Sequence, residues 1–539
     1  MNLVQNRAER LYVAVVATVS SFLLLLGGPF SNFSSAGYLD PWYYFAYFTN
    51  FRYLVHTYGP NYYVARLPWI LPGLLAFKLA SPETASVLLN AALMTVSAIA
   101  LYWAVRWHYG ITPAVLACAA LATNPQFISA IGWDYPDGPA IAYAFIALAF
   151  AVRPHGSAAW NLVCATVFVT LSALTHLSGA SMQVSILALA VWRHRASFKW
   201  TRLAVLVAAA GGGAVVALIP LSQFLVGRWT YFYWQIYKAA HIVANPGVVD
   251  TMYGTGFAFL STAPRLFAPA FLLLAGLWLL RRRTSDVAWH AWAILAATFA
   301  LLSVVEFVLH VPTLRVPFHG TYLILPLFFF AGVLLGEMGK LDQRAAVAIG
   351  VLVFILPFAG QVLMQELPMW MPLFILSAAM LIAPGPWKQA SLLTLLFLAP
   401  CLDRSVGAMW DVPKGRNLET TRTLLDFQGY LTKAVDPERR IQFWLDNDEA
   451  SPLFVSAEAL YLSIHDDFTK EIATAPAAEI RENLKPNATL VHLTNHPERM
   501  EARRKLLADR GIVAGNERTI ALPWATVILQ DVTSMSALK

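Results

Sequence analysis

The chain has 539 residues, of which 58% are hydrophobic and 13% are charged, and its formal net charge is +7. A soluble globular chain is roughly half apolar and about one quarter charged, so this composition excludes an ordinary soluble domain and favours a membrane protein. The basic residues collect in short loops between apolar stretches, which is typical of cytoplasmic loops. We therefore expect these basic residues to lie in the cytoplasmic loops of a membrane protein, and we expect no nucleic-acid partner.

The first apolar stretch, at about residues 11–29, follows Arg7 and Arg10. Basic residues before a first span place the N-terminus in the cytoplasm. A signal peptide has a similar basic start, but no small-x-small cleavage site follows, so the sequence favours a retained anchor. Residues 30–82 then form the first outer loop, and their density of Tyr, Trp and Pro is typical of interfacial helices.

The remaining apolar stretches predict a bundle of about 13 spans in residues 1–403. Each strongly basic short loop, such as 193–202 and 281–283, falls on the cytoplasmic side when the spans alternate in direction. The predicted spans include about 84–104, 112–131, 203–226, 288–309 and 389–403, and a shorter one at about 139–152.

Residues 404–539 differ from the rest because charged residues return and long apolar runs stop. Segments 441–445 and 490–494 read as strands, 497–509 as a helix, and 520–529 as a final strand or pair of strands. The predicted fold class is therefore mainly α: a polytopic membrane helical bundle with a small C-terminal α/β domain outside the membrane.

Two acidic segments lie in loops on the same predicted side of the membrane. Asp40 belongs to Leu-Asp-Pro-Trp-Tyr-Tyr at 39–44, after the first span, and Asp134 and Asp137 follow the third. Carboxylates in such a place can act as a general base or help to hold a divalent cation. The alternative is structural, because Asp before Pro or Gly-Pro can also cap a helix.

Several cationic or acidic residues lie near the outer ends of other spans. Arg315 is suited to bidentate binding of a lipid phosphate, although it can equally be a solvated interface residue. His176 is a second candidate phosphate contact or a packing histidine, and His319 lies in the same outer stretch as Arg315. Glu306 falls inside a span, where an acid is costly and indicates a function, or else a paired structural role.

The acidic segments carry a resemblance. Segment 39–44 resembles the Asp-Pro-Trp/Tyr motif of oligosaccharyltransferase catalytic subunits, and Asp-Tyr-Pro-Asp-Gly-Pro at 134–139 resembles their second acidic motif. Leu-Thr-His at 174–176 is similar to the Leu-Thr-Lys element of bacterial protein mannosyltransferases and aminoarabinose transferases, with His in place of Lys. Together these segments resemble the GT-C superfamily of membrane glycosyltransferases.

The resemblance implies a helical bundle with an inner N-terminus and a catalytic aspartate in the first outer loop. It implies a multi-pass enzyme of the inner (plasma) membrane that transfers a sugar, with inversion, from a polyprenyl phosphate or pyrophosphate at the outer leaflet. Asp40 would act as the base, with Asp134 and Asp137 as further catalytic residues.

The same resemblance suggests how the donor phosphate and the acceptor are handled. Arg315, His176 and His319 would bind the donor phosphate. A divalent cation, Mg²⁺ or Mn²⁺, is an open cofactor assignment, with Asp40, Asp134 and Glu306 as its ligands. The acceptor would be a glycan, a lipid or a protein, although the tail lacks the Trp-Trp-Asp-Tyr-Gly motif of sequon-reading oligosaccharyltransferases.

Two other classes of function remain open from the sequence. A lipid or solute transporter or flippase would place ionisable residues near the middle of the membrane, and Glu306 is the residue that fits this class. A non-catalytic scaffold would use the tail to bind a partner, with Asp-Asn-Asp at 446–448 as its best contact.

Overall fold

The structure is a computed structural model of the whole chain. The residues it describes are 9, 11, 13–21, 39–122, 124–132, 135–244, 273, 285–309, 313–314, 321–337, 426–427, 429–431, 433–436, 439–444, 487–522 and 525–535.

The chain divides into two compact units. The first contains residues 1–32 and 60–416, and the second contains residues 33–59 and 417–539. These limits differ from the division at 403/404 that the sequence suggests, because the segment 33–59 groups with the tail. The functional division into 1–403 and 404–539 stays a prediction.

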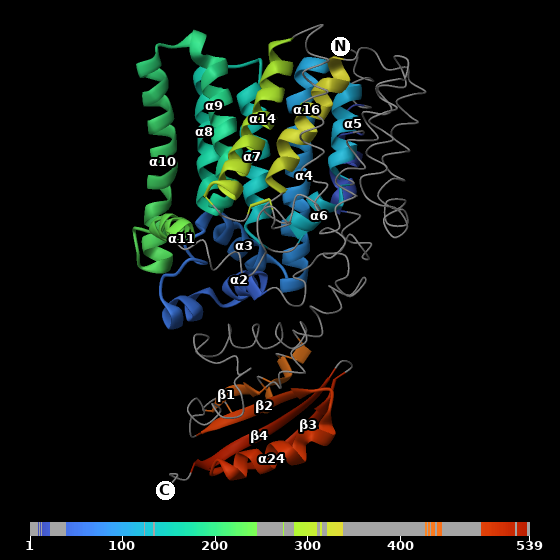
Figure 1. Cartoon of the computed structure of the whole chain (residues 1–539), viewed down its shortest axis with the longest axis vertical. Coiled ribbons are helices and arrows are strands. Elements are labelled where there is room, and N and C mark those ends of the chain that lie inside the picture. Colours follow the sequence, from blue (N-terminus) through green and yellow to red (C-terminus); the bar gives the residue numbers. More distant parts are fainter. Residues whose placement is uncertain are drawn as a thin grey trace. The chain divides into compact units, whose positions relative to one another are not determined.

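The described part of the first unit is a bundle of helices (Figure 1). The helices, with short 3-10 turns between them, are α3 (Leu67–Leu79), α4 (Pro82–Tyr109), α5 (Ile111–Ala122), α6 (Pro125–Gly132), α7 (Asp137–Val152), α8 (Ala158–Thr175), η2 (Leu177–Gly179), α9 (Ala180–His194), η3 (Arg195–Ser197), α10 (Trp200–Val226), α11 (Tyr233–Ala244), α14 (Asp286–Phe307), η6 (Thr321–Leu323) and α16 (Ile324–Glu337).

Four helices of the described residues are long and apolar enough to cross a membrane: α4, α8, α10 and α14. Shorter apolar helices accompany them, among them α5, α7 and the combined segment Thr321–Glu337. The chain is therefore a membrane protein, as its composition predicts. The total of about 13 spans depends on residues outside the described ranges and stays a prediction.

Within the predicted span at about 112–131 the structure has two helices rather than one. α5 ends at Ala122 and α6 begins at Pro125. The Asn124 side-chain oxygen accepts a hydrogen bond from the backbone N–H of Phe127 at 2.9 Å, so Asn124 caps α6. Proline has no backbone N–H and favours the first helical position, which explains why the helix restarts here.

Packing in the bundle brings distant segments together at one end. α7 packs against α4, α8 and α9, while α16 packs against α5 and α14. α10 packs against α8 at the edge of the bundle (Figure 1). Residues from three places can meet at this end of the bundle: the start of α7, the end of α8, and η6, which leads into α16.

The second unit contains helix α2 (Leu39–Tyr58) and a four-stranded sheet. The strands are β1 (Arg440–Trp444), β2 (Ala488–Thr494), β3 (Ile512–Ala521) and β4 (Thr526–Met535), in the order β1-β2-β4-β3. β1 and β2 are parallel, and the other two neighbouring pairs are antiparallel.

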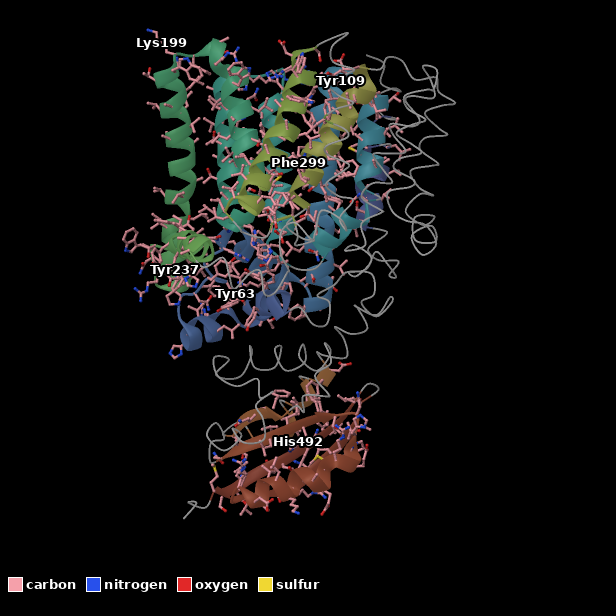
Figure 2. The ribbon with its side chains drawn as sticks, viewed as in Figure 1. Tyr63, Tyr109, Lys199, Tyr237, Phe299 and His492 are labelled. Carbon is pink, nitrogen blue, oxygen red and sulfur yellow. The ribbon has the colours of Figure 1, made fainter. Side chains whose placement is uncertain are left out.

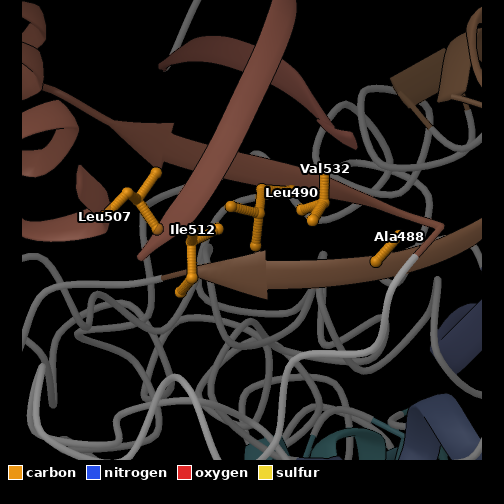
Figure 3. Packing of buried hydrophobic residues seen from close by; sticks show 5 residues of the cluster. All are labelled: Ala488, Leu490, Leu507, Ile512 and Val532. Atoms are coloured by element: carbon orange, nitrogen blue, oxygen red, sulfur yellow. The ribbon is translucent and has the colours of Figure 1, made fainter. Parts of the chain in front are cut away.

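Helix α24 (Met500–Asp509) contributes to a small apolar core with the sheet. Its Leu507 clusters with Ala488, Leu490, Ile512 and Val532, all of them buried (Figure 3). The strands at 441–444 and 490–494 and the helix after Pro497 lie where the sequence predicts them. The segment predicted as a final strand or pair of strands, 520–529, contains the end of β3 and the start of β4. A hydrogen bond from the Leu522 N–H to the Ala525 carbonyl closes the turn between them.

Candidate active site

The second acidic segment is built into the start of α7. Asp137 is the first residue of this helix and is fully buried. The N-cap residue of α7 is Pro136, and the buried Asp137 Oδ2 has no hydrogen-bond partner among the described residues. The other carboxylate oxygen, Oδ1, accepts a hydrogen bond from the phenolic hydroxyl of Tyr322 in η6. A buried carboxylate is thus held by a side chain from a different part of the bundle.

His176 completes a three-residue cluster with Asp137 and Tyr322. Its Nδ1 lies 3.0 Å from the Tyr322 hydroxyl oxygen and 3.5 Å from Asp137 Oδ1. A tyrosine hydroxyl has one proton, and here it goes to the carboxylate, so the hydroxyl oxygen accepts from His176 only if Nδ1 carries hydrogen. This arrangement leaves Nε2 as the imidazole nitrogen that faces away from the cluster.

Arg66 brings a positive charge to the same buried region. The residue precedes α3 and is fully buried. Its guanidinium carbon lies 4.0 Å from the centre of the Tyr62 ring and 5.5 Å from the centre of the Tyr135 ring. Its charge acts on both Asp137 and Tyr322. The rings shield a cation that is close to a buried carboxylate.

The aromatic residues also link Arg66 to the histidine. The Tyr135 ring lies edge-on to the His176 imidazole, with 5.6 Å between ring centres. The imidazole is in turn nearly parallel to the Tyr322 ring, at 6.3 Å. One acid, one histidine, one arginine and two tyrosines therefore form a continuous buried group, which we call the Asp137 cluster.

A supporting set of hydrogen bonds fixes the chain around His176. Gln183 donates to the Ser172 hydroxyl at 3.0 Å and to the His176 carbonyl at 3.1 Å. Gln235 of α11 donates to the Leu174 carbonyl at 2.6 Å. These bonds satisfy polar groups where α8 ends, so His176 leaves the helix in a defined direction.

Gly179 lets Tyr322 approach the α8–α9 connection. A Cβ atom at position 179 would lie 2.8 Å from Cε1 of the Tyr322 ring. Such a distance is too short for two carbon atoms, so a larger residue would displace the ring. The glycine is therefore required by the position of Tyr322.

Four other predicted site residues lie wholly or partly outside the described part of the chain. Asp40 is the second residue of α2, and its side chain lies outside the described residues. Asp134, Arg315 and His319 also lie outside them. The structure therefore brings Asp137 and His176 together, and the roles of all the predicted site residues stay predictions.

Glu306 is buried near the end of α14 and holds the backbone that follows it. Its Oε2 accepts from the Thr313 N–H at 2.6 Å and the Leu314 N–H at 2.8 Å. These hydrogen bonds join the buried acid to the backbone of the segment that follows α14.

The described residues contain no group of three or more His, Cys, Asp or Glu side chains that could hold a metal ion. Asp137 and His176 are close enough to share one ligand, but both already contact Tyr322. The proposed metal ligands also include the side chain of Asp40 and all of Asp134, which lie outside the described residues. A metal role for Asp40, Asp134 and Glu306 stays a prediction.

Sequence reasoning missed Arg66 and Tyr322. Arg66 stands just before an apolar helix with proline near its start, a place where a lone arginine usually marks an interface anchor. Tyr322 stands in an apolar run three residues after His319. No spacing relates either residue to Asp137, since only the packing of the bundle brings them together.

Comparison with known proteins gives a fold but no sequence relative. Neither a protein-family model nor a curated protein sequence matches the chain. The structure is similar to that of ArnT from Cupriavidus metallidurans in the apo state, with a TM-score of 0.50 and 16% identity over 99% of this chain and 100% of that chain. ArnT bound to undecaprenyl phosphate gives a TM-score of 0.49 and 16% identity over 98% and 99%.

A further match is the archaeal oligosaccharyltransferase AglB from Archaeoglobus fulgidus, solved with an inhibitory peptide and a dolichol-phosphate. Its TM-score is 0.32 and its identity 14%, over 94% of this chain and 60% of that chain. ArnT and AglB are both GT-C proteins. The full-length match to apo ArnT confirms the predicted resemblance at the level of the fold.

Proposed function

We propose that the chain is a GT-C membrane glycosyltransferase that takes a sugar from a polyprenyl-phosphate-linked donor and transfers it to an acceptor at the outer face of the membrane. The observation that carries this proposal is the Asp137 cluster, where a buried acid, an arginine and a histidine meet at one end of a bundle with the fold of ArnT. Charged groups in such a place are costly unless they serve a purpose. The undecaprenyl phosphate bound to ArnT supports the choice of donor class.

The donor phosphate would be bound by cationic groups at this end of the bundle. Arg315, His176 and His319 are the phosphate contacts expected from the sequence, and the buried position of Arg66 adds a fourth candidate. Arginine can form two parallel hydrogen bonds to one phosphate. When the bond between the sugar and the phosphate oxygen breaks, that oxygen gains negative charge, and a cation already in place stabilises it without reorganisation.

The reaction step itself can be written with Asp40 as the base. The acceptor hydroxyl gives its proton to the Asp40 carboxylate, and its oxygen forms the new bond to the anomeric carbon of the sugar. The bond from that carbon to the phosphate oxygen breaks, and the phosphate leaves with the electron pair. Attack from the side opposite the leaving group inverts the configuration.

Asp134 and Asp137 would be further catalytic residues without being the primary base. Asp137 receives the hydroxyl of Tyr322 and lies next to His176, so its negative charge can keep the neighbouring cations oriented for phosphate. The membrane module, residues 1–403, would carry these groups, and the α/β domain, residues 404–539, would lie outside the inner membrane.

Mass spectrometry of lipid bound to the purified protein tests the donor class. We expect polyprenyl phosphate, or its glycosylated form, to be released from the wild type on organic extraction. Arg66→Gln should release much less, whereas Arg202→Gln, which changes an exposed arginine at the other end of the bundle, should release a normal amount. Absence of polyprenyl lipids from the wild type, with no transfer from lipid-linked sugars, would contradict the proposal.

A further inference from the structure

The end of the bundle opposite the Asp137 cluster carries its own group of charges. α9 ends at His194, η3 covers Arg195–Ser197, and α10 begins at Trp200. Lys199, just before α10, lies at this end, whereas Tyr63 and Tyr237 lie at the other (Figure 2). The cationic side chains of Arg195, Lys199 and Arg202 are all exposed here.

These cations are not neutralised within the described part of the protein. Arg106, at the same end, forms an ion pair with Glu9 at 2.7 Å. Among the described residues, no carboxylate forms such a pair with Arg195, Lys199 or Arg202. Three positive charges that form no ion pair with a described carboxylate lie within eight residues of sequence and repel one another, and a negatively charged partner would relieve this repulsion.

Exposed aromatic side chains lie beside these cations. Trp192 is 52% exposed and Trp200 is 64% exposed, although both are large and apolar. The Arg195 guanidinium carbon lies 3.1 Å from the centre of the Trp192 ring, and that of Arg202 lies 5.2 Å from the centre of the Phe198 ring. Exposed tryptophans beside cations are typical of the headgroup layer of a membrane.

We infer that Arg195, Lys199 and Arg202, together with Trp192 and Trp200, form a binding surface for anionic phospholipid headgroups such as phosphatidylglycerol. We call it the α9–α10 surface. The guanidinium and ammonium groups would contact the phosphodiester, while the indoles would lie among the headgroups. Because α10 continues from this surface as an apolar helix whose first turns include the exposed Val205, the acyl chains have an apolar face to follow.

The choice of a lipid rather than a soluble anion follows from this apolar continuation. A free phosphate would use the cations alone and would gain nothing from exposed tryptophans or from the face of α10. A phospholipid uses both, since its charged headgroup and its acyl chains are joined in one molecule. The basic loop also lies on the predicted cytoplasmic side, where anionic lipids attract basic segments.

Lipid binding to the purified full-length protein in detergent tests the inference. Phosphatidylglycerol or phosphatidylcholine is added in steps, and native mass spectrometry measures the bound lipid. We expect the wild type to prefer phosphatidylglycerol. Each cation near an anionic surface contributes about fivefold to binding, so Arg195→Gln, Lys199→Gln and Arg202→Gln combined should weaken phosphatidylglycerol binding on the order of a hundredfold.

Matched variants separate this surface from general charge effects. A control with Arg228→Gln, Lys433→Gln and Lys505→Gln removes the same charge from exposed positions elsewhere and should bind phosphatidylglycerol normally. A charge-preserving variant, Arg195→Lys, Lys199→Arg and Arg202→Lys, should retain most of the binding and shows that the surface folds. Inorganic phosphate and glycerophosphoglycerol, which lack acyl chains, should fail to compete at matched ionic strength.

Three results would overturn the inference: equal binding of both lipids by the wild type, unchanged phosphatidylglycerol binding after neutralisation, or an equal loss in the control variant. Effective competition by the water-soluble headgroup would likewise overturn it, because the site would then bind phosphate rather than a lipid.

Discussion

The phenolic hydroxyl of Tyr322 donates a hydrogen bond to the buried carboxylate of Asp137, although the two residues are 185 positions apart in the chain. The same hydroxyl lies 3.0 Å from Nδ1 of His176. Tyr322 thus connects the start of α16 to the start of α7 and the end of α8, and it links an acid to a histidine at a proposed donor site.

Removal of the Tyr322 hydroxyl should weaken both the fold and the transfer reaction. Tyr322→Phe keeps the ring but leaves Asp137 without this donor, which should cost about 1–3 kcal/mol of stability. Turnover of lipid-linked sugar and thermal unfolding in detergent measure the two effects. Tyr231→Phe, which removes another buried tyrosine hydroxyl bonded to the Val215 carbonyl, should lower stability without a comparable loss of turnover. Equal turnover in both variants would show that Tyr322 is structural only.

A methyl group at Gly179 should disturb the cluster by displacing the Tyr322 ring. Gly179→Ala places a Cβ 2.8 Å from a ring carbon, so we expect turnover to fall while the bundle stays helical by circular dichroism. Gly212→Ala is the control, because a Cβ there meets nothing within 4 Å, and alanine favours a helix over glycine by up to about 1 kcal/mol. Normal turnover in Gly179→Ala would mean that the position of Tyr322 is unimportant for transfer.

The shape of the Arg66 side chain should matter as much as its charge. Arg66→Lys keeps a cation but loses the planar fork that binds phosphate bidentately and stacks on Tyr62. We expect the apparent donor constant to rise in Arg66→Lys and to rise further in Arg66→Gln, with the acceptor constant unchanged. A titration of donor against fixed acceptor gives these values. An unchanged donor constant in both variants would assign Arg66 to packing.

Features that depend on residues close together in the sequence could be predicted from it, whereas contacts between distant residues could not. The apolar helices α4, α8, α10 and α14 and the strands β1 and β2 follow from local patterns, and the structure has them close to the predicted places. The break between α5 and α6 also has a local signal, since Asn124 and Pro125 are a favoured cap and first helical residue. That signal was hidden by the apolar run around it.

The partners in the site have no local signal at all. Asp137 and His176 stood out because a carboxylate and a histidine are unusual beside a span. Tyr322 and Arg66 are found only when the bundle packs. Likewise, the hydrogen bonds from the backbone N–H groups of Thr313 and Leu314 to Glu306 have no local signal.

Mild acid should destabilise the sheet of the second unit through His492. Burial, with help from the charge of Arg503, lowers the pKa of this histidine to about 3. Below about pH 6.5 the His492 side chain of the unfolded protein takes up a proton, whereas that of the folded protein stays neutral down to about pH 3. The free energy of unfolding is therefore highest above pH 6.5 and decreases as the pH falls toward 3. Between pH 7 and pH 5 the loss should be about 2 kcal/mol.

Hydrogen exchange of the β2 amides measures this effect, after correction for the pH dependence of intrinsic exchange. His492→Gln should remove most of the pH dependence, even if the variant is less stable at pH 7. His496→Gln, at a partly exposed position in the turn after β2, should leave it intact. A wild-type sheet whose stability does not change between pH 7 and pH 5 would contradict the role of His492.

The most direct test of the central claim is the turnover of a polyprenyl-phosphate-linked sugar by Asp40→Asn. Asp40 lies in the first turn of α2, and asparagine supports a helix start about as well as aspartate, so the variant should fold normally. Loss of the proposed general base should lower turnover by roughly two to four orders of magnitude. A folded Asp40→Asn protein with wild-type turnover would contradict the assignment of Asp40 and the glycosyl-transfer mechanism built on it.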